Sequence, residues 1–105
     1  MIIRAWRGRA RPAKSDAYPR HFHDTVVPSL RDVPGFLGAH LSRREEGDEV
    51  EFLLLTRWQS MEAIRAFAGP AVAKAVVEPG AIAALDDFDA TVRHYEVIEE
   101  VLPAH

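Results

Sequence analysis

Runs of apolar residues with strand-like composition alternate along the chain with runs that have helical spacing. Residues 2–10, 36–44, 49–58 and 91–98 are rich in β-formers and are bounded by turn residues, which predicts four strands. Helix-like patterns fill the intervals after the first and third strands. The resulting order, β-α-β-β-α-β, is that of ferredoxin-like folds. The sequence therefore predicts an α+β domain with an antiparallel four-stranded sheet.

The first helix is expected to begin at Ser15 or Asp16, either of which can cap it, with Pro19 in its first turn. Pro28 cannot donate the backbone bond to Asp24, so a bend is expected near it. Positions three and four apart form one apolar stripe on this helix. The stripe consists of Tyr18, Phe22, Val26, Ser29 or Leu30, and Val33.

A second helix is expected after Gln59-Ser60, with a buried side made of Ala63, Ile64, Phe67 and Ala68. Gly69-Pro70 interrupts this helix. Residues 71–77 are expected to resume as helix, and 81–88 to form a further short helical segment.

The third strand is apolar on both of its faces. Phe52, Leu54 and Trp58 point one way, and Leu53 and Leu55 point the other. Two helices can cover only one face, and exposure of a leucine costs about 1.5–3 kcal/mol relative to full burial. We therefore expect the second face to pack on another copy of the chain, in a two-fold homodimer.

The composition is that of a globular protein with one core. The chain has 105 residues, of which 48% are hydrophobic and 28% charged, so a single domain spanning 1–105 is expected, with 98–105 as a tail. The absence of cysteine excludes disulfides and thiolate chemistry. Because the chain opens directly into a strand-like run, without a signal-peptide pattern, we expect a cytoplasmic protein. No apolar run reaches the roughly 20 residues of a membrane span.

Charges are uneven although the net charge is only −3. Basic residues collect at the N-terminus and acidic residues near the C-terminus. Alternate arginines on a strand point to opposite faces, and no aromatic stacking motif accompanies them, so ion pairing is expected rather than nucleic-acid binding. The acidic group Asp86, Asp87 and Asp89 lacks the glycine and terminal glutamate of a calcium loop, and no metal site is expected.

Three motifs resemble the antibiotic biosynthesis monooxygenase-like family of dimeric α/β barrels. They are a first strand that ends in a proline-containing loop, the sequence VPGF at 33–36, and the sequence LTRWQSMEAIRAF at 55–67. The resemblance extends to about Val97. It implies a dimeric barrel formed from two ferredoxin-like sheets.

The resemblance also implies a choice of activities, because the family contains oxygenases without metal or flavin, heme-degrading enzymes and members without an assigned reaction. The heme-degrading branch has an asparagine on the first strand, where this chain has Trp6 or Arg7, and a tryptophan where this chain has Phe67. Val77 stands in place of its iron-ligating histidine, which makes heme degradation unexpected. Of the residues in the polyketide-oxidising branch, only the tryptophan is kept, as Trp58.

The histidines are the best candidates for chemistry near neutral pH. His21 lies at the border of the apolar stripe, and His94 lies on a strand expected beside the first. We expect these two as catalytic bases and five aromatic residues as the substrate-binding wall: Trp6, Tyr18, Phe22, Phe67 and Trp58. The alternative is that the aromatic residues are simple core and that both histidines are hydrogen-bonded border residues.

These observations lead to two functional expectations and a structural one. The first is a small-molecule-binding homodimer that resembles cofactor-independent monooxygenases, acting on an aromatic or polyketide-like substrate with no cofactor. The second is a non-catalytic or stress-associated dimer that binds a hydrophobic ligand. The third is a structural subunit whose own side chains fill the pocket. A cavity large enough for a ring system, with a histidine nitrogen exposed inside it, would favour the enzyme. An aromatic pocket whose polar groups are all paired would favour the binding protein, and a solid core would favour the structural subunit.

Overall fold

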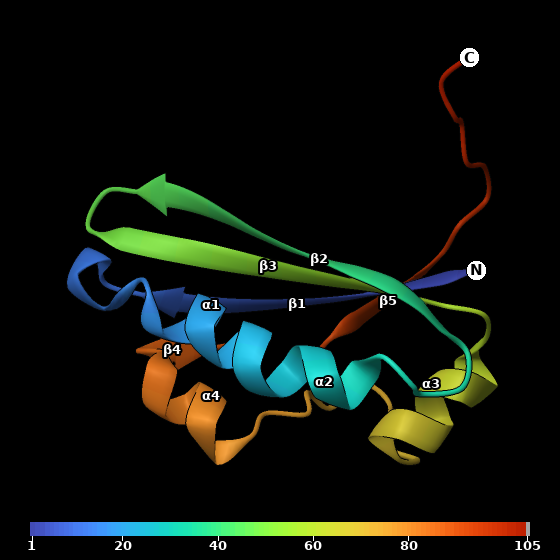
Figure 1. Ribbon diagram of the computed structural model, residues 1–105, viewed down its shortest axis with the longest axis horizontal. Helices are drawn as coiled ribbons and strands as arrows, with labels where there is room; N and C mark the ends of the chain where they lie inside the picture. Colours follow the sequence, from blue (N-terminus) through green and yellow to red (C-terminus); the bar gives the residue numbers. More distant parts are fainter. Residues whose placement is uncertain (105) are drawn as a thin grey trace.

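The protein forms one antiparallel sheet with helices on one of its faces (Figure 1), as seen in a computed structural model that describes residues 1–104. The long strands are β1 (Ile2–Ala10), β2 (Phe36–Glu46) and β3 (Glu49–Trp58). They lie in the order β2-β3-β1, and the short strands β4 (Asp87–Phe88) and β5 (Arg93–Glu96) both pair with the outer edge of β1. The predicted α+β class and strand order are confirmed. His105, expected in the tail, lies outside the described residues.

The layer after β1 consists of a 3₁₀ turn, η1 (Pro12–Lys14), followed by α1 (Ala17–His21), a π-helical turn, η2 (Phe22–Val26), and α2 (Val27–Leu30). The irregularity expected near Pro28 takes the form of this π turn, in which the N–H of Val27 donates to the carbonyl of Phe22. A widened turn just before a proline gives room for its ring, which clashes with the carbonyl four residues earlier in a regular helix.

The second helix, α3 (Met61–Ala68), begins where predicted, and α4 (Pro79–Ala84) follows later in the chain. The prediction of helix for 71–77 is wrong, because that segment pairs as extended chain with residues 90–92. Ala75 donates to the carbonyl of Ala90, and Val92 donates to the carbonyl of Ala73. The helix predicted for 81–88 ends at Ala84, since Asp87 and Phe88 join β1 as β4.

The core lies between the sheet and the helices and has two parts. One is built around Trp6, Tyr18 and Phe52, and the other around Trp58 and Ile64. Even-numbered residues of β1 and β3 face this core, as the alternation of strand side chains requires. The first helical layer contributes to both parts, with Tyr18 and Phe22 in the one and Val26 and Leu30 in the other, so its apolar stripe joins them.

Within the described part of the chain, residues 1–104, the opposite face of the sheet carries no helix (Figure 1). Leu53 and Leu55 lie on it, partly exposed, together with Tyr95, which is 51% exposed. The predicted split of the third strand into two apolar faces is therefore confirmed.

Ion pairs join the basic N-terminal strand to the acidic segment near the C-terminus. The guanidinium of Arg9 donates to Asp89 at 2.6 Å and to Asp87 at 2.9 Å, and these contacts raise its pKa. The backbone N–H of Arg11 donates to Asp86 at 2.8 Å, which holds the pKa of that carboxyl below its usual range. These contacts fasten β4 to the end of β1. Within residues 1–104, helices long and apolar enough to cross a membrane are absent.

Candidate functional site

A cavity of about 70 Å³ lies between the sheet and the helices. A closed apolar cavity that binds benzene has about 150 Å³, so this smaller cavity, which is partly open to solvent, admits one aromatic ring only if part of the ring stays outside it, and it excludes several fused rings. Four of the residues predicted for the site line it: Trp6, Tyr18, His21 and Phe67. Phe22, Trp58 and His94 do not. The cavity thus lies between the elements named in the sequence analysis, and three of the seven residues expected at the site lie outside it.

Aromatic rings form the wall of the cavity at the middle of β1. The ring of Tyr18 packs 5.7 Å from that of Trp6 and 5.6 Å from that of Phe52. Trp6 donates its indole N–H to the carbonyl of Asp89 at 2.8 Å, so its orientation is fixed. Burial, and then the negative charge of Glu78, raise the pKa of the Tyr18 phenol. Tyr18 is therefore a neutral wall residue at physiological pH.

His21, at the end of α1, has a buried nitrogen without a partner. Its Nε2 makes no hydrogen bond, and the nearest carboxylate oxygen, on Glu78, is 4.0 Å away. The imidazole ring packs against Gly80 so closely that a Cβ there would lie 2.7 Å from its Cε1 and 2.8 Å from its Nδ1. A glycine at 80 therefore makes room for the histidine ring. The unpartnered nitrogen is free to accept a proton or a hydrogen bond from a ligand.

His94 already has a hydrogen-bond partner. It lies opposite Arg4 across the β1–β5 pairing, and its Nε2 is 2.9 Å from Nη1 of Arg4. Because arginine can only donate, Nε2 of His94 must accept, which requires a neutral ring protonated at Nδ1. Burial and the charge of Arg4 lower the pKa of His94. A lone pair held in this way is a poor base for a ligand.

Arg4 is the residue of the site that the sequence reasoning missed. It is only 6% exposed and lines the cavity from the helix-facing side of β1. Its guanidinium donates to the carbonyls of Val72 and Lys74 at 2.7 and 3.2 Å, which ties the 71–77 segment to the sheet. Alternation along β1 places Arg4 on the same face as Trp6, and that signal could have found it.

The two remaining expected wall residues belong to the core. Trp58 is fully buried, donates to Oγ1 of Thr56 at 2.9 Å, and packs 5.2 Å from the ring of Phe67. Phe22 packs against the cluster around Tyr18 without reaching the cavity. Both positions are explained by packing alone.

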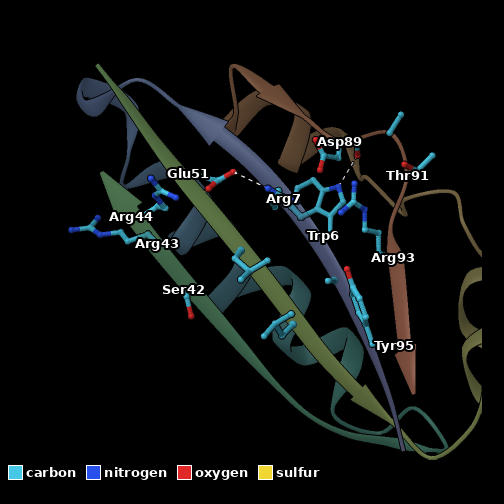
Figure 2. Close-up of a pocket in the computed structure, with 14 residues that line it drawn as sticks. Trp6, Arg7, Ser42, Arg43, Arg44, Glu51, Asp89, Thr91, Arg93 and Tyr95 are labelled. Carbon is cyan, nitrogen blue, oxygen red and sulfur yellow. Dashed lines mark hydrogen bonds and ion pairs between the residues drawn. The ribbon is translucent and has the colours of Figure 1, made fainter. Parts of the chain in front are cut away.

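The open face of the sheet has a larger hollow, of about 700 Å³ (Figure 2). Leu53 and Leu55 are among the residues that line it, and Tyr95 of β5 stands at one side. Its charged rim includes Arg7, which lies 3.7 Å from Glu51 across the β1–β3 pairing. The hollow thus combines a few apolar side chains with many charged ones, and both kinds of side chain occur at surfaces that pack on a partner.

The fold and the cavity together define a small-molecule-binding protein built on a ferredoxin-like sheet. The sequence profile of one family, described as antibiotic biosynthesis monooxygenase, matches residues 1–79. The chain belongs to this family, as its resemblance predicted. A comparison with curated proteins finds no significant match.

Solved structures agree on the fold over nearly the whole chain. The heme degrader MhuD from Mycobacterium tuberculosis, solved with two hemes in its active site, is 27% identical, with 96% of this chain and 99% of that one covered and a TM-score of 0.61. The monooxygenase ActVA-Orf6 of Streptomyces coelicolor, in complex with nanaomycin D, is 18% identical, with 98% and 92% covered and a TM-score of 0.64. A candidate antibiotic biosynthesis monooxygenase from Deinococcus radiodurans is 19% identical, with 100% of each chain covered and a TM-score of 0.64.

Proposed function

We propose that the protein is a cytoplasmic homodimer that binds a small aromatic substrate in the helix-side cavity and oxygenates it without metal or organic cofactor. The observation that carries this proposal is the buried, unpartnered Nε2 of His21 in a cavity walled by Trp6 and Tyr18. A histidine nitrogen without a partner, inside a cavity with mostly apolar walls, is placed to take the proton of a phenol.

The reaction needs no external reductant. His21 accepts the phenolic proton, and the electron-rich phenolate reduces dioxygen. One oxygen atom forms a new bond to the ring carbon para to the hydroxyl, the C–H bond at that carbon breaks, and the second oxygen atom leaves as water. The overall change, a phenol plus dioxygen to a para-quinone plus water, removes four electrons from the ring and adds four to dioxygen. The phenolic proton and the ring hydrogen both end in the water.

The two histidines predicted as bases have different roles in this proposal. His21 is the base, because its nitrogen has no competing partner. His94 is a positioning residue, because its nitrogen accepts from Arg4. Tyr18 and Trp6 hold the ring, while Phe67 closes the side of the cavity formed by α3.

Oxygen uptake with a panel of single-ring phenols that have a free para position tests the proposal. His21→Gln should lower the rate by about 10²–10⁴-fold, the usual contribution of a general base. His23→Gln is the matched control, because His23 is exposed on the same helical layer and should leave the rate unchanged. No uptake by the wild type with any phenol, or equal rates for wild type and His21→Gln, would reject the enzyme.

A second candidate is a non-catalytic or stress-associated dimer that only binds a ligand. It is favoured by the number of polar groups at the site that already have partners, including the indole N–H of Trp6 and the hydroxyl of Thr56. Saturable ligand binding without oxygen uptake by the wild type would support it over the enzyme.

Heme does not fit this chain. The helix-side cavity, at about 70 Å³, is far smaller than a porphyrin, and Val77 lies where the resemblance places an iron ligand. Heme degradation therefore forms no part of the proposal, although MhuD has the same fold.

A further inference from the structure

We propose that the cavity selects single-ring aromatic compounds that carry a carboxylate, and that Arg4 binds this carboxylate. The inference rests on the proposed function in taking the helix-side cavity as the ligand site. It narrows the substrate from aromatic compounds in general to small anionic ones. Three features of Arg4 carry it: its uncompensated charge, its unused donors and its place relative to His21.

The charge of Arg4 has no acidic partner. Among residues 1–104, carboxylates within ion-pair distance of its guanidinium are absent, although seven other ion pairs that involve arginine or lysine occur on this chain's surface and edges. Burial is the cause of the lowered pKa of Arg4, with no neighbouring acid to oppose it. A buried cation held only by neutral carbonyls and a neutral imidazole is costly, and an anionic ligand would offset that cost.

The guanidinium keeps donors for a ligand. Of its five N–H groups, two on Nη1 donate to the carbonyl of Val72 and to Nε2 of His94, and one on Nη2 donates to the carbonyl of Lys74. The Nε–H and the second N–H of Nη2 remain. Two donors on one planar group match the two oxygens of a carboxylate, which is the usual geometry of arginine–carboxylate recognition.

The two ends of the cavity differ in charge. Tyr18 packs on Phe52, which lies opposite Gly8, whereas Arg4 lies opposite Thr56, four residues away along β1. The carboxylate of Glu78 lies 4.0 Å from Nε2 of His21, and its charge helps to raise the pKa of Tyr18. This negative side chain therefore lies at the Tyr18 end of the cavity. A carboxylate is repelled from that end and attracted to Arg4. The hydroxyl of the same ring then lies toward His21.

Anaerobic titration with a matched pair of ligands tests the inference. The probes are 3-hydroxybenzoate and 3-hydroxybenzamide, which have the same ring and hydroxyl but differ in charge. Binding is followed by tryptophan fluorescence, because Trp6 lines the cavity. In the wild type at pH 7.5, the benzoate should bind at least ten-fold more tightly than the benzamide. Arg4→Met should abolish this preference, and Arg4→Lys should keep part of it.

Two outcomes overturn the inference. One is equal affinity of the wild type for the two ligands, and the other is a full carboxylate preference in folded Arg4→Met. Arg4 also holds the 71–77 segment, so circular dichroism must show that the variants fold. If Arg4→Met does not fold, the two ligands are compared on the wild type and Arg4→Lys. A carboxylate preference in Arg4→Lys as large as that of the wild type would then overturn the inference, because lysine cannot offer the two-point fork of arginine.

The same experiment separates the inference from the proposed function. His21→Gln should retain the carboxylate preference while losing oxygen uptake. A carboxylate preference with no oxygen uptake by the wild type would reject the proposed oxygenase and support the anion site. Oxygen uptake by the wild type together with equal affinities for the benzoate and the benzamide would support the proposed oxygenase and reject the anion site.

Discussion

Arg4 and His94 show how one buried side chain decides what its neighbour can do. The guanidinium holds Nε2 of His94 as an acceptor, which fixes the neutral form of the imidazole. His94 therefore titrates with a pKa below that of a free histidine, through burial and the charge of Arg4. In the unfolded chain the same residue takes up a proton near pH 6.5. The difference makes stability depend on pH.

We predict that the folded protein loses stability as the pH falls from 7.5 to 5. Above about pH 6.5 His94 is neutral in both states and contributes no slope. Below this pH, His94 is protonated in the unfolded chain but stays neutral in the folded one. Its contribution lowers the free energy of unfolding by at most about 1.4 kcal/mol for each pH unit. Thermal unfolding followed by circular dichroism across this range measures the effect.

His94→Gln is the matched variant for this prediction, because a glutamine oxygen can still accept from Arg4 but does not titrate. Its stability should depend less steeply on pH than that of the wild type. Asp86 and Asp87, whose pKa values are lowered by neighbouring donors, stay ionised throughout and do not confuse the comparison. Identical slopes for the two proteins would show that His94 is not held neutral.

At the scale of elements, the short helix α3 depends on its cap. Oγ of Ser60 accepts from the backbone N–H of Ala63 at 3.2 Å, which satisfies one of the free donors of the first turn. Ser60→Ala should lower the free energy of unfolding by about 1 kcal/mol. Ser29→Ala is the control, since its exposed hydroxyl only bonds back to the carbonyl of Val26, and its loss should cost clearly less. Equal costs in urea unfolding would contradict a capping role.

The elements that could be predicted from the sequence are those with a strong local signal. The long strands are runs of β-formers bounded by turn residues, α3 has a cap, and Gly35 adopts the positive φ of 84° that a turn between two such elements requires. The 71–77 segment could not be predicted, because its alanines favour helix while its conformation is set by distant partners, Arg4 and residues 90–92. The aromatic wall could be anticipated from the apolar stripe of the first helix. The Arg4–His94 contact could not, because it joins residues that are far apart in the sequence.

At the scale of the whole molecule, the open face of the sheet leaves apolar side chains uncovered. Leu53 and Leu55 lie on that face beside Tyr95, and the chain has no further helix within residues 1–104 to cover them. The last described segment, beyond β5, runs away from the body of the subunit (Figure 1) and exposes Ile98, Val101 and Leu102. Both features are expected of a chain that buries apolar surface against a second copy.

Leu53→Asp should therefore convert the protein from dimer to monomer at micromolar concentration. The substitution places a charge in the centre of the proposed interface, where it is buried without a partner, while the core on the helix side is untouched. Sedimentation velocity measures the change in mass, and circular dichroism checks that the monomer is folded. Arg43→Asp is a control at the edge of the same hollow, where a charge stays solvated and the dimer should persist. A wild-type protein that sediments as a monomer under these conditions would contradict the proposed dimer. The tests of Arg4 and His21 would still apply, because the residues that line the helix-side cavity all come from one chain.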